Sequence, residues 1–281
     1  NINKMIAKAK GTYIIFISCD DVLNKNAISN AVNKLDADDN LCFVGGGRVF
    51  FMYDDNNKKT KTIEENKDLG YVNNGDPDAL LESEYTKLHS FFMQGTVFRK
   101  KIVDAIGGFD EDMTGDDIVF RIKIARYIKN NPPLTFEIGN FATFLYRQHE
   151  TNLNRNTIRQ IKTIFEVMER YFDDRPFPGL LIDWINGAIA GGKEKELGDL
   201  IRTRMMDRNI SLVHRARIAE TFFALYSVAL IKVNSRTYRY AQRIRKIFRK
   251  IFPKGSLQTK IARFFFNQLK KIRRFVVKHD T

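Results

Sequence analysis

Thr12-Tyr-Ile-Ile-Phe-Ile-Ser18, followed at once by Cys19-Asp20-Asp21, is the most informative segment of this chain. Its β-branched and aromatic residues run without a polar break, which is typical of a buried strand, apolar on both faces, in a parallel α/β sheet. The acids begin where the strand ends. We therefore expect an α/β fold with Asp20 and Asp21 at the carboxyl end of a core strand, the edge where such sheets bind ligands.

The pattern downstream alternates between strand and helix. It predicts helices over 24–35, 100–105 and 116–127, strands over 41–53, 90–98 and 136–147, and a polar surface loop over 54–80. Gly107 and Gly108 would end the second helix. This alternation favours an α/β domain over residues 1–150.

Residues beyond about 150 have a different character. Apolar residues recur at helical spacing over 158–165, 180–190, 197–206 and 211–233. We expect a helical region over 151–235 and a separate basic amphipathic helical tail over 236–281.

The tail carries most of the net charge of +14, because residues 231–281 contain 16 Lys and Arg but a single acid, Asp280. Its helical stripes of Ile, Leu and Phe favour attachment to an anionic membrane surface. Two alternatives stay open, packing of the stripes on the rest of the protein and binding of nucleic acid. Nucleic acid is the less favoured, because no RNA-binding motif is present.

Composition excludes several classes of protein. Of 281 residues, 43% are hydrophobic and 28% are charged, which is ordinary globular usage and excludes disorder, collagen and coiled coil for the whole chain. Two cysteines make no disulfide framework and fit a reducing cytosol. No apolar run reaches the ~20 residues of a membrane span, and we expect no signal peptide. We expect a cytoplasmic protein, peripheral at the inner face of the cell membrane.

Two acidic pairs are candidates for chemistry. Adjacent carboxylates such as Asp20 and Asp21 repel each other, so a cation is a common reason for both to stay ionised, and hard oxygen ligands suit Mg²⁺ or Mn²⁺. Such a metal would neutralise a diphosphate leaving group. Asp116 and Asp117 could provide a general base for an attacking hydroxyl. The structural alternatives are a helix N-cap for the first pair and favourable interaction with a helix dipole for the second.

A third candidate is Tyr146-Arg147-Gln148-His149, which closes the α/β part. Arg147 is suited to phosphate, and a neutral His149 imidazole is suited to a metal. A lone histidine in a purely structural role is the alternative.

Four segments in this order resemble family-2 glycosyltransferases. Ala9–Asp21 resembles their A-x-G-x-Y-I-x-F-L-D-x-D-D segment, and Thr96–Arg99 with Ile106–Glu111 resembles their acceptor-side F-R and I-G-G-F-D-E segments. Gly115-Asp116-Asp117 matches the place of their E-D pair, and Tyr146–His149 resembles their Y-R-x-H ending. The resemblance covers residues 1–155 and leaves the helical remainder out.

The resemblance implies a partial GT-A fold, a Rossmann-like mixed sheet, and inverting transfer from a nucleotide-diphosphate sugar, with a UDP-sugar favoured. On the donor side it assigns the metal, Mn²⁺ or Mg²⁺, to Asp20 and His149, a flanking place to Asp21, and the diphosphate to Arg147. Ser18 stands where the family has the first Asp of D-x-D, and its hydroxyl would bond the donor ribose.

On the acceptor side, the resemblance assigns the catalytic base to Asp117, with Asp116 in place of the family's Glu. Gly95 and Thr96 would lie near the acceptor, a glycan or a lipid-linked sugar in surface polysaccharide synthesis. The family's first strands, which bind the nucleotide base, have no counterpart here, and we expect them to precede Asn1. A non-catalytic glycan-binding or membrane scaffold module, suggested by Ser18, is the alternative.

Overall fold

The computed structural model describes residues 2–54, 60–66, 75–148 and 156–231, together with Arg243 and Ile247. The chain divides into two compact units, Asn1–Arg155 and Asn156–Thr281. The predicted tail over 236–281 and His149 therefore lie outside the described residues, apart from Arg243 and Ile247.

The first unit is built on a mixed sheet. Its strands are β1 (Tyr13–Ile15), β2 (Val22–Leu23), β3 (Leu41–Asp54), β4 (Thr60–Asn66), β5 (Val97–Arg99) and β6 (Thr135–Gln148). The order is β1-β5-β3-β6-β2, and β4 pairs with β3 outside this path. The long central strands β3 and β6 run parallel, and the other pairs are antiparallel.

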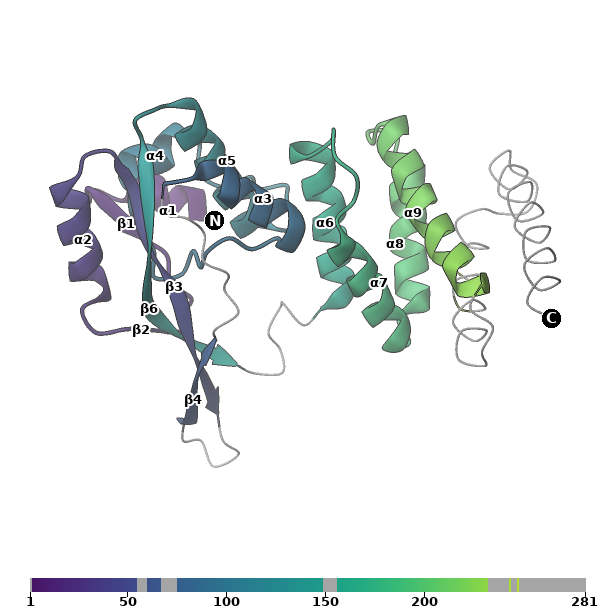
Figure 1. The fold of residues 1–281 in the computed structure, drawn as a ribbon, viewed down its shortest axis with the longest axis horizontal. Helices are drawn as coiled ribbons and strands as arrows, with labels where there is room; N and C mark the ends of the chain where they lie inside the picture. Colours follow the sequence, from purple (N-terminus) through teal and green to yellow (C-terminus); the bar gives the residue numbers. More distant parts are fainter. Residues whose placement is uncertain are drawn as a thin grey trace. The chain divides into compact units, whose positions relative to one another are not determined.

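Helices cover both faces of this sheet (Figure 1). They are α1 (Ile2–Lys8), α2 (Ala27–Ala37), α3 (Pro77–Lys87), α4 (Lys100–Ala105) and α5 (Asp116–Asn130). Successive side chains of a strand point to opposite faces, so neighbouring residues enter different cores. Phe43 packs in the larger core with Phe120 of α5, whereas Val44 packs in the smaller core with Ala31 and Leu35 of α2.

Several helices and strands of the first unit were predicted. Helix α4 has the predicted bounds, α2 begins three residues later and ends two residues later than predicted, α5 extends beyond its predicted end, and the central strands β3 and β6 fall where expected. Gly107 and Gly108 follow α4 with φ of 71° and 60°, the left-handed conformation that ends a helix.

Three predictions for this unit were wrong. The segment 12–18 forms only the three-residue β1, which is antiparallel to β5. It is half-buried, not buried on both faces, because β1 is an edge strand of the sheet. The predicted loop over 54–80 contains β4 and the start of α3, whose N-cap Asp76 accepts hydrogen bonds from the Asp78 and Ala79 amides. The strand expected over 90–98 begins only at Val97, because Gly95 takes a φ of 73°.

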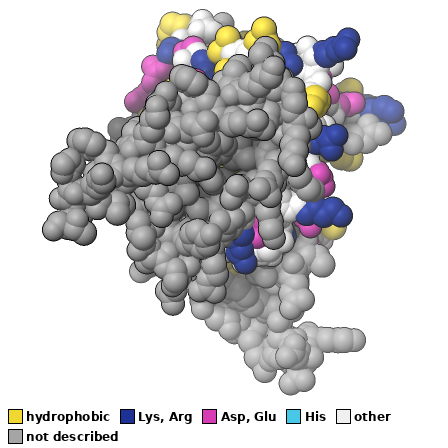
Figure 2. All heavy atoms as spheres, turned by 90° about the vertical axis from the view of Figure 1, so that its right-hand side faces the viewer, with side chains coloured by type: hydrophobic (Ala, Val, Ile, Leu, Met, Phe, Trp, Pro, Cys, Tyr) yellow, Lys and Arg dark blue, Asp and Glu magenta, His cyan; other side chains and the backbone are white. Residues whose placement is uncertain are grey.

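The second unit is helical where it is described, which confirms the expected mixed α/β part followed by a helical region. Its helices are α6 (Thr157–Tyr171), α7 (Gly179–Ala190), α8 (Glu194–Met206) and α9 (Leu212–Ile231). Their buried residues follow helical spacing, as with Ile161, Ile164 and Phe165 of α6. Described side chains visible in Figure 2 carry both signs of charge, with basic and acidic groups interspersed.

Among the residues that the structure describes, no helix is long and apolar enough to cross a membrane. The two cysteines are both free, Cys19 exposed and Cys42 buried, as expected from their number. Burial raises the pKa of the Cys42 thiol to about 11, so this side chain stays neutral in the core.

Candidate functional site

The first acidic pair lies in a turn between β1 and β2. The Asp21 amide donates to the Ser18 carbonyl at 3.2 Å, which closes the turn. Ser18 is exposed, whereas Asp20 and Asp21 are half-buried. Because β2 pairs with β6, opposite Phe144 and Leu145, the turn comes to lie beside the end of β6.

Arg147 of β6 joins this turn. Its backbone amide donates to Asp21 Oδ1 at 2.9 Å, and its Nε donates to the Asp20 carbonyl at 2.9 Å. Arg147 is thus in direct contact with two other predicted donor-side residues, Asp20 and Asp21, which lie 127 and 126 positions earlier in the sequence. A turn that carries two carboxylates is thus joined to a strand that carries a guanidinium, and these groups are suited to a metal and to a phosphate.

The metal prediction concerns Asp20 and His149, with Asp21 beside them. Asp20 and Asp21 provide hard oxygen atoms, and Mg²⁺ commonly binds through one or two carboxylates together with substrate phosphates. Within the described part of the chain, no three His, Cys, Asp or Glu side chains gather as a metal site. His149, the other predicted ligand, is outside the described residues, so its role stays a prediction.

Gly95 and Thr96 directly precede β5, and Gly95 lies next to Phe16, the residue that follows β1. The Gly95 amide donates to the Phe16 carbonyl at 2.9 Å, and Thr96 is fully buried, with its hydroxyl donating to the Phe92 carbonyl at 2.6 Å. A Cβ on Gly95 would lie 2.6 Å from Thr143 Oγ1. These two residues therefore fix the backbone in the structure, and their contact with an acceptor stays a prediction.

The second acidic pair begins helix α5. Asp116 is the first residue of the helix, and its Oδ1 accepts from the Asp117 amide at 3.0 Å. Asp117 Oδ2 accepts from Arg121 Nη1 at 2.9 Å, one helical turn later, and the Asp117 side chain is 44% exposed. Asp117 is thus a partly exposed carboxylate that is bonded to a buried cation.

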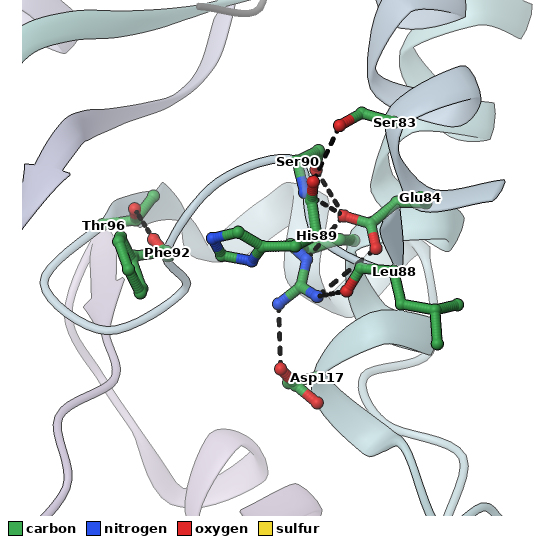
Figure 3. A network of polar contacts seen from close by, with 9 residues as sticks. Ser83, Glu84, Leu88, His89, Ser90, Phe92, Thr96 and Asp117 are labelled. Carbon is green, nitrogen blue, oxygen red and sulfur yellow. Dashed lines mark hydrogen bonds and ion pairs between the residues drawn. The ribbon is translucent and has the colours of Figure 1, made fainter. Parts of the chain in front are cut away.

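That cation belongs to a buried ion pair between α3 and α5. Arg121 is 2% exposed and Glu84 is fully buried, and Arg121 Nε donates to Glu84 Oε1 at 2.6 Å. Arg121 Nη2 donates to Glu84 Oε2 at 3.3 Å and to the Leu88 carbonyl at 3.1 Å. Ser90 donates to Glu84 Oε1 through its amide, at 2.8 Å, and through its hydroxyl (Figure 3).

This arrangement changes the acidity of two groups. Burial by itself would raise the pKa of Asp117, but the charge and hydrogen bond of Arg121 outweigh it and hold the pKa below its ordinary value. Burial and, to a lesser extent, the nearby charge of Arg121 lower the pKa of His89 to about 3. In Figure 3 the His89 ring extends toward Phe92, which it meets edge-on at 4.8 Å. Near neutral pH, Asp117 is ionised and His89 is uncharged.

Sequence reasoning missed Glu84, His89 and Arg121. The spacing of four residues between Asp117 and Arg121 was a signal for an ion pair on one helix face. Asp76 followed by Pro77 was a signal for the start of α3, which carries Glu84. No local pattern indicated that α3 and α5 would bring the two charges together, because their pairing depends on the tertiary fold.

Comparison with known proteins supplies the family. The family model for Glycosyl transferase family 2 matches residues 1–107. Residues 1–107 belong to this glycosyltransferase family. The matched part includes the Asp20-Asp21 turn, Glu84, His89, Gly95 and Thr96, whereas α5 and β6 follow it. No curated protein matches the chain.

Among solved structures, the chain is similar to mannosyltransferase PcManGT from Pyrobaculum calidifontis, determined in complex with GDP-Man and Mn²⁺. The identity is 13% and the TM-score is 0.37, and the match covers 90% of this chain. This chain spans 66% of the length of that structure.

Proposed function

We propose that this chain is an inverting glycosyltransferase that moves a sugar from a nucleotide-diphosphate donor to an acceptor hydroxyl. The observation that carries the proposal is the contact of Arg147 with the Asp20-Asp21 turn, within a unit whose first 107 residues belong to family 2. This contact brings a guanidinium and two carboxylates to one end of the sheet, a combination suited to a diphosphate and its cation.

In the proposed reaction, the residues divide between donor and acceptor. Arg147 would bind the diphosphate, Ser18 the ribose, and Asp20 with Asp21 a divalent cation, which neutralises the leaving group when bound. Asp117 would take the proton of the acceptor hydroxyl as its oxygen bonds the anomeric carbon. The bond between that carbon and the diphosphate oxygen breaks at the same time, and the nucleoside diphosphate leaves with the electron pair.

The test is release of nucleoside diphosphate by the full-length natural polypeptide. UDP-, GDP-, CDP- and dTDP-sugars would be supplied with Mn²⁺ and then with EDTA. We expect turnover of one donor that is lost with EDTA, and at least ~100-fold lower turnover in Asp20→Asn and Asp117→Asn with the fold retained, since general base catalysis alone contributes about 10²–10⁴-fold. Full activity in either variant would reject the role of that residue.

A second candidate is a non-catalytic glycan-binding or scaffold module. Ser18 favours it, because a hydroxyl replaces the carboxylate at the first position of the family's D-x-D motif. Glycan binding that is unaffected by EDTA, with no turnover of any donor, would support this candidate over the transferase.

We further propose a place for the enzyme at the inner face of the cell membrane, in the synthesis of a surface polysaccharide. The support is the charge of residues 231–281, which hold 16 basic residues and one acid, with apolar residues at helical spacing. Flotation with vesicles that contain anionic lipid, but not with neutral vesicles, is expected. Equal flotation with both kinds of vesicle would contradict an electrostatic attachment.

A further inference from the structure

The buried charges behind Asp117 have no part in the reaction as proposed so far. Glu84 is fully buried and Arg121 is 2% exposed, although burial of a charge is costly unless hydrogen bonds satisfy it. Here the bonds are abundant, because Glu84 accepts from Ser90 and Arg121, and Arg121 also donates to the Leu88 carbonyl. The guanidinium is thereby fixed from α3 and from the start of the 88–96 segment.

One edge of the fixed guanidinium faces outward. Its Nε and Nη2 bond to Glu84 and Leu88, whereas Nη1 bonds to Asp117 Oδ2 at 2.9 Å. In Figure 3, Glu84 and Leu88 lie on one side of the network and Asp117 lies apart from them, at the start of α5. Because Asp117 is 44% exposed, the chain of charges runs from the core to a carboxylate that solvent reaches.

We propose that Glu84 and Arg121 are positioning residues for Asp117: the buried pair fixes the guanidinium, which keeps the Asp117 carboxylate ionised and oriented. This inference rests on the proposed function, in which Asp117 is the base. Arg121 acts through Asp117, and Glu84 acts through Arg121.

The charged and titratable groups around Asp117 decide how this works. They are Asp116 and Arg121 on α5, His89 on the 88–96 segment, and Glu84 on α3 behind Arg121. Glu84 compensates most of the Arg121 charge, so that Arg121 can stay in the core, while the neutral His89 adds no second cation. The cost is a weaker base, since Arg121 favours the ionised form of Asp117. The gain is a base that is always ready and held in one orientation.

The first experiment measures the Asp117 titration directly. Carboxyl NMR on the full-length protein with ¹³C-labelled aspartate, assigned with Asp117→Asn, would compare wild type with Glu84→Gln/Arg121→Met. The double variant removes both buried charges, so it leaves no unpaired buried ion and is expected to be more stable than Arg121→Met alone. Lys129→Met is the matched control, because Lys129 lies on the same helix as Asp117 and its ion pair with Asp78 of α3 is exposed.

We expect the midpoint of Asp117 to rise by one pH unit or more in the double variant and to stay unchanged in Lys129→Met. An unchanged midpoint in a folded double variant would overturn the proposal. This readout does not depend on turnover, so it separates a failure of the positioning network from a failure of the proposed function.

The second experiment measures the pH profile of nucleoside diphosphate release. We expect the acid limb of kcat/KM to move up by the same shift in the double variant, with kcat at least tenfold lower and KM for the donor unchanged. Arg121→Lys keeps the cation, so its acid limb should lie at the wild-type pH, while its kcat should stay below that of wild type.

Loss of activity with an unmoved acid limb would mean that the pair only packs α3 against α5, and would overturn the proposal. If wild type releases no nucleoside diphosphate with any donor, or Asp117→Asn keeps full activity, the proposed function fails, and the positioning role in catalysis fails with it. A shifted Asp117 midpoint would then mark the network as an electrostatic feature without a catalytic role.

Discussion

The same dipeptide, Asp-Asp, lies in two different environments in this protein. Asp20 and Asp21 form a half-buried turn whose partner is Arg147. The Arg147 amide donates to the Asp21 carboxylate, and its Nε donates to the Asp20 backbone carbonyl. Asp117, in contrast, bonds to a guanidinium that is buried against Glu84. The first pair is bonded to a backbone amide and to a side chain of β6, whereas Asp117 of the second pair is bonded to a cation that is fixed in the core. The same dipeptide is therefore held by contacts with a neighbouring strand in one place and by a buried ion pair in the other.

The largest expected difference between the two regions is in stability. Arg121→Met should lower the free energy of unfolding by about 3–5 kcal/mol, because it leaves the Glu84 charge buried without its partner. Arg147→Met should cost about 1 kcal/mol, because Nε donates one hydrogen bond to a carbonyl at the edge of the sheet and the amide is unchanged. Urea denaturation followed by circular dichroism measures both. Equal losses of unfolding free energy in Arg121→Met and Arg147→Met would contradict the contrast between the buried ion pair and the half-buried turn.

The second difference is in pH dependence. The pKa of His89 is about 3 in the fold and about 6.5 in an unfolded chain, so the unfolded state binds its proton first as the pH falls. The stability of wild type relative to His89→Gln is expected to be unaffected above pH 6.5. Below it, the relative stability should fall by up to about 1.4 kcal/mol per pH unit until about pH 3.

Unfolding of both proteins between pH 7 and pH 4 measures this effect. A constant difference between wild type and His89→Gln over that range would mean that His89 titrates normally. It would then lie in a wetter environment than its contact with Phe92 indicates.

A smaller effect concerns the backbone that supports the first pair. Gly95 and Gly107 have φ of 73° and 71°, but only Gly95 is crowded, by Thr143 Oγ1 at 2.6 Å from an added Cβ. Gly95→Ala should therefore cost about 2–3 kcal/mol, and Gly107→Ala about 1 kcal/mol from the left-handed backbone alone. Thermal unfolding of the two variants gives the comparison. If Gly107→Ala is the more harmful, crowding at Gly95 is not the controlling factor.

The smallest effect is expected for an exposed charge on the same helix as Asp117. Lys129→Met removes an ion pair with Asp78 in which both side chains are at least half exposed, so the change in unfolding free energy should stay within about 0.5 kcal/mol. A loss near that of Arg121→Met, measured in the same urea series, would show that burial is not what distinguishes these pairs.

Local patterns predicted much of the fold and indicated the two acidic pairs and Arg147 as candidate site residues. The apolar spacing of 116–127 and the glycines after 105 predicted α5 and the end of α4, since these signals act within a few residues. The run over 12–18 misled, because its hydrophobicity does not specify how many strands flank it. Glu84 and Arg121 were missed since a buried ion pair depends on helix packing between residues 37 positions apart.

Binding of a nucleoside diphosphate tests the central contrast most directly. Calorimetry with UDP, GDP, CDP and dTDP in the presence of Mn²⁺ would be carried out on the full-length wild type, Asp20→Asn and Asp117→Asn. We expect Asp20→Asn to bind the preferred diphosphate at least tenfold more weakly than wild type. Asp117→Asn should bind it as tightly as wild type but lose turnover. Weakened binding in Asp117→Asn, with wild-type binding in Asp20→Asn, would contradict the division of donor and acceptor roles between the two acidic pairs.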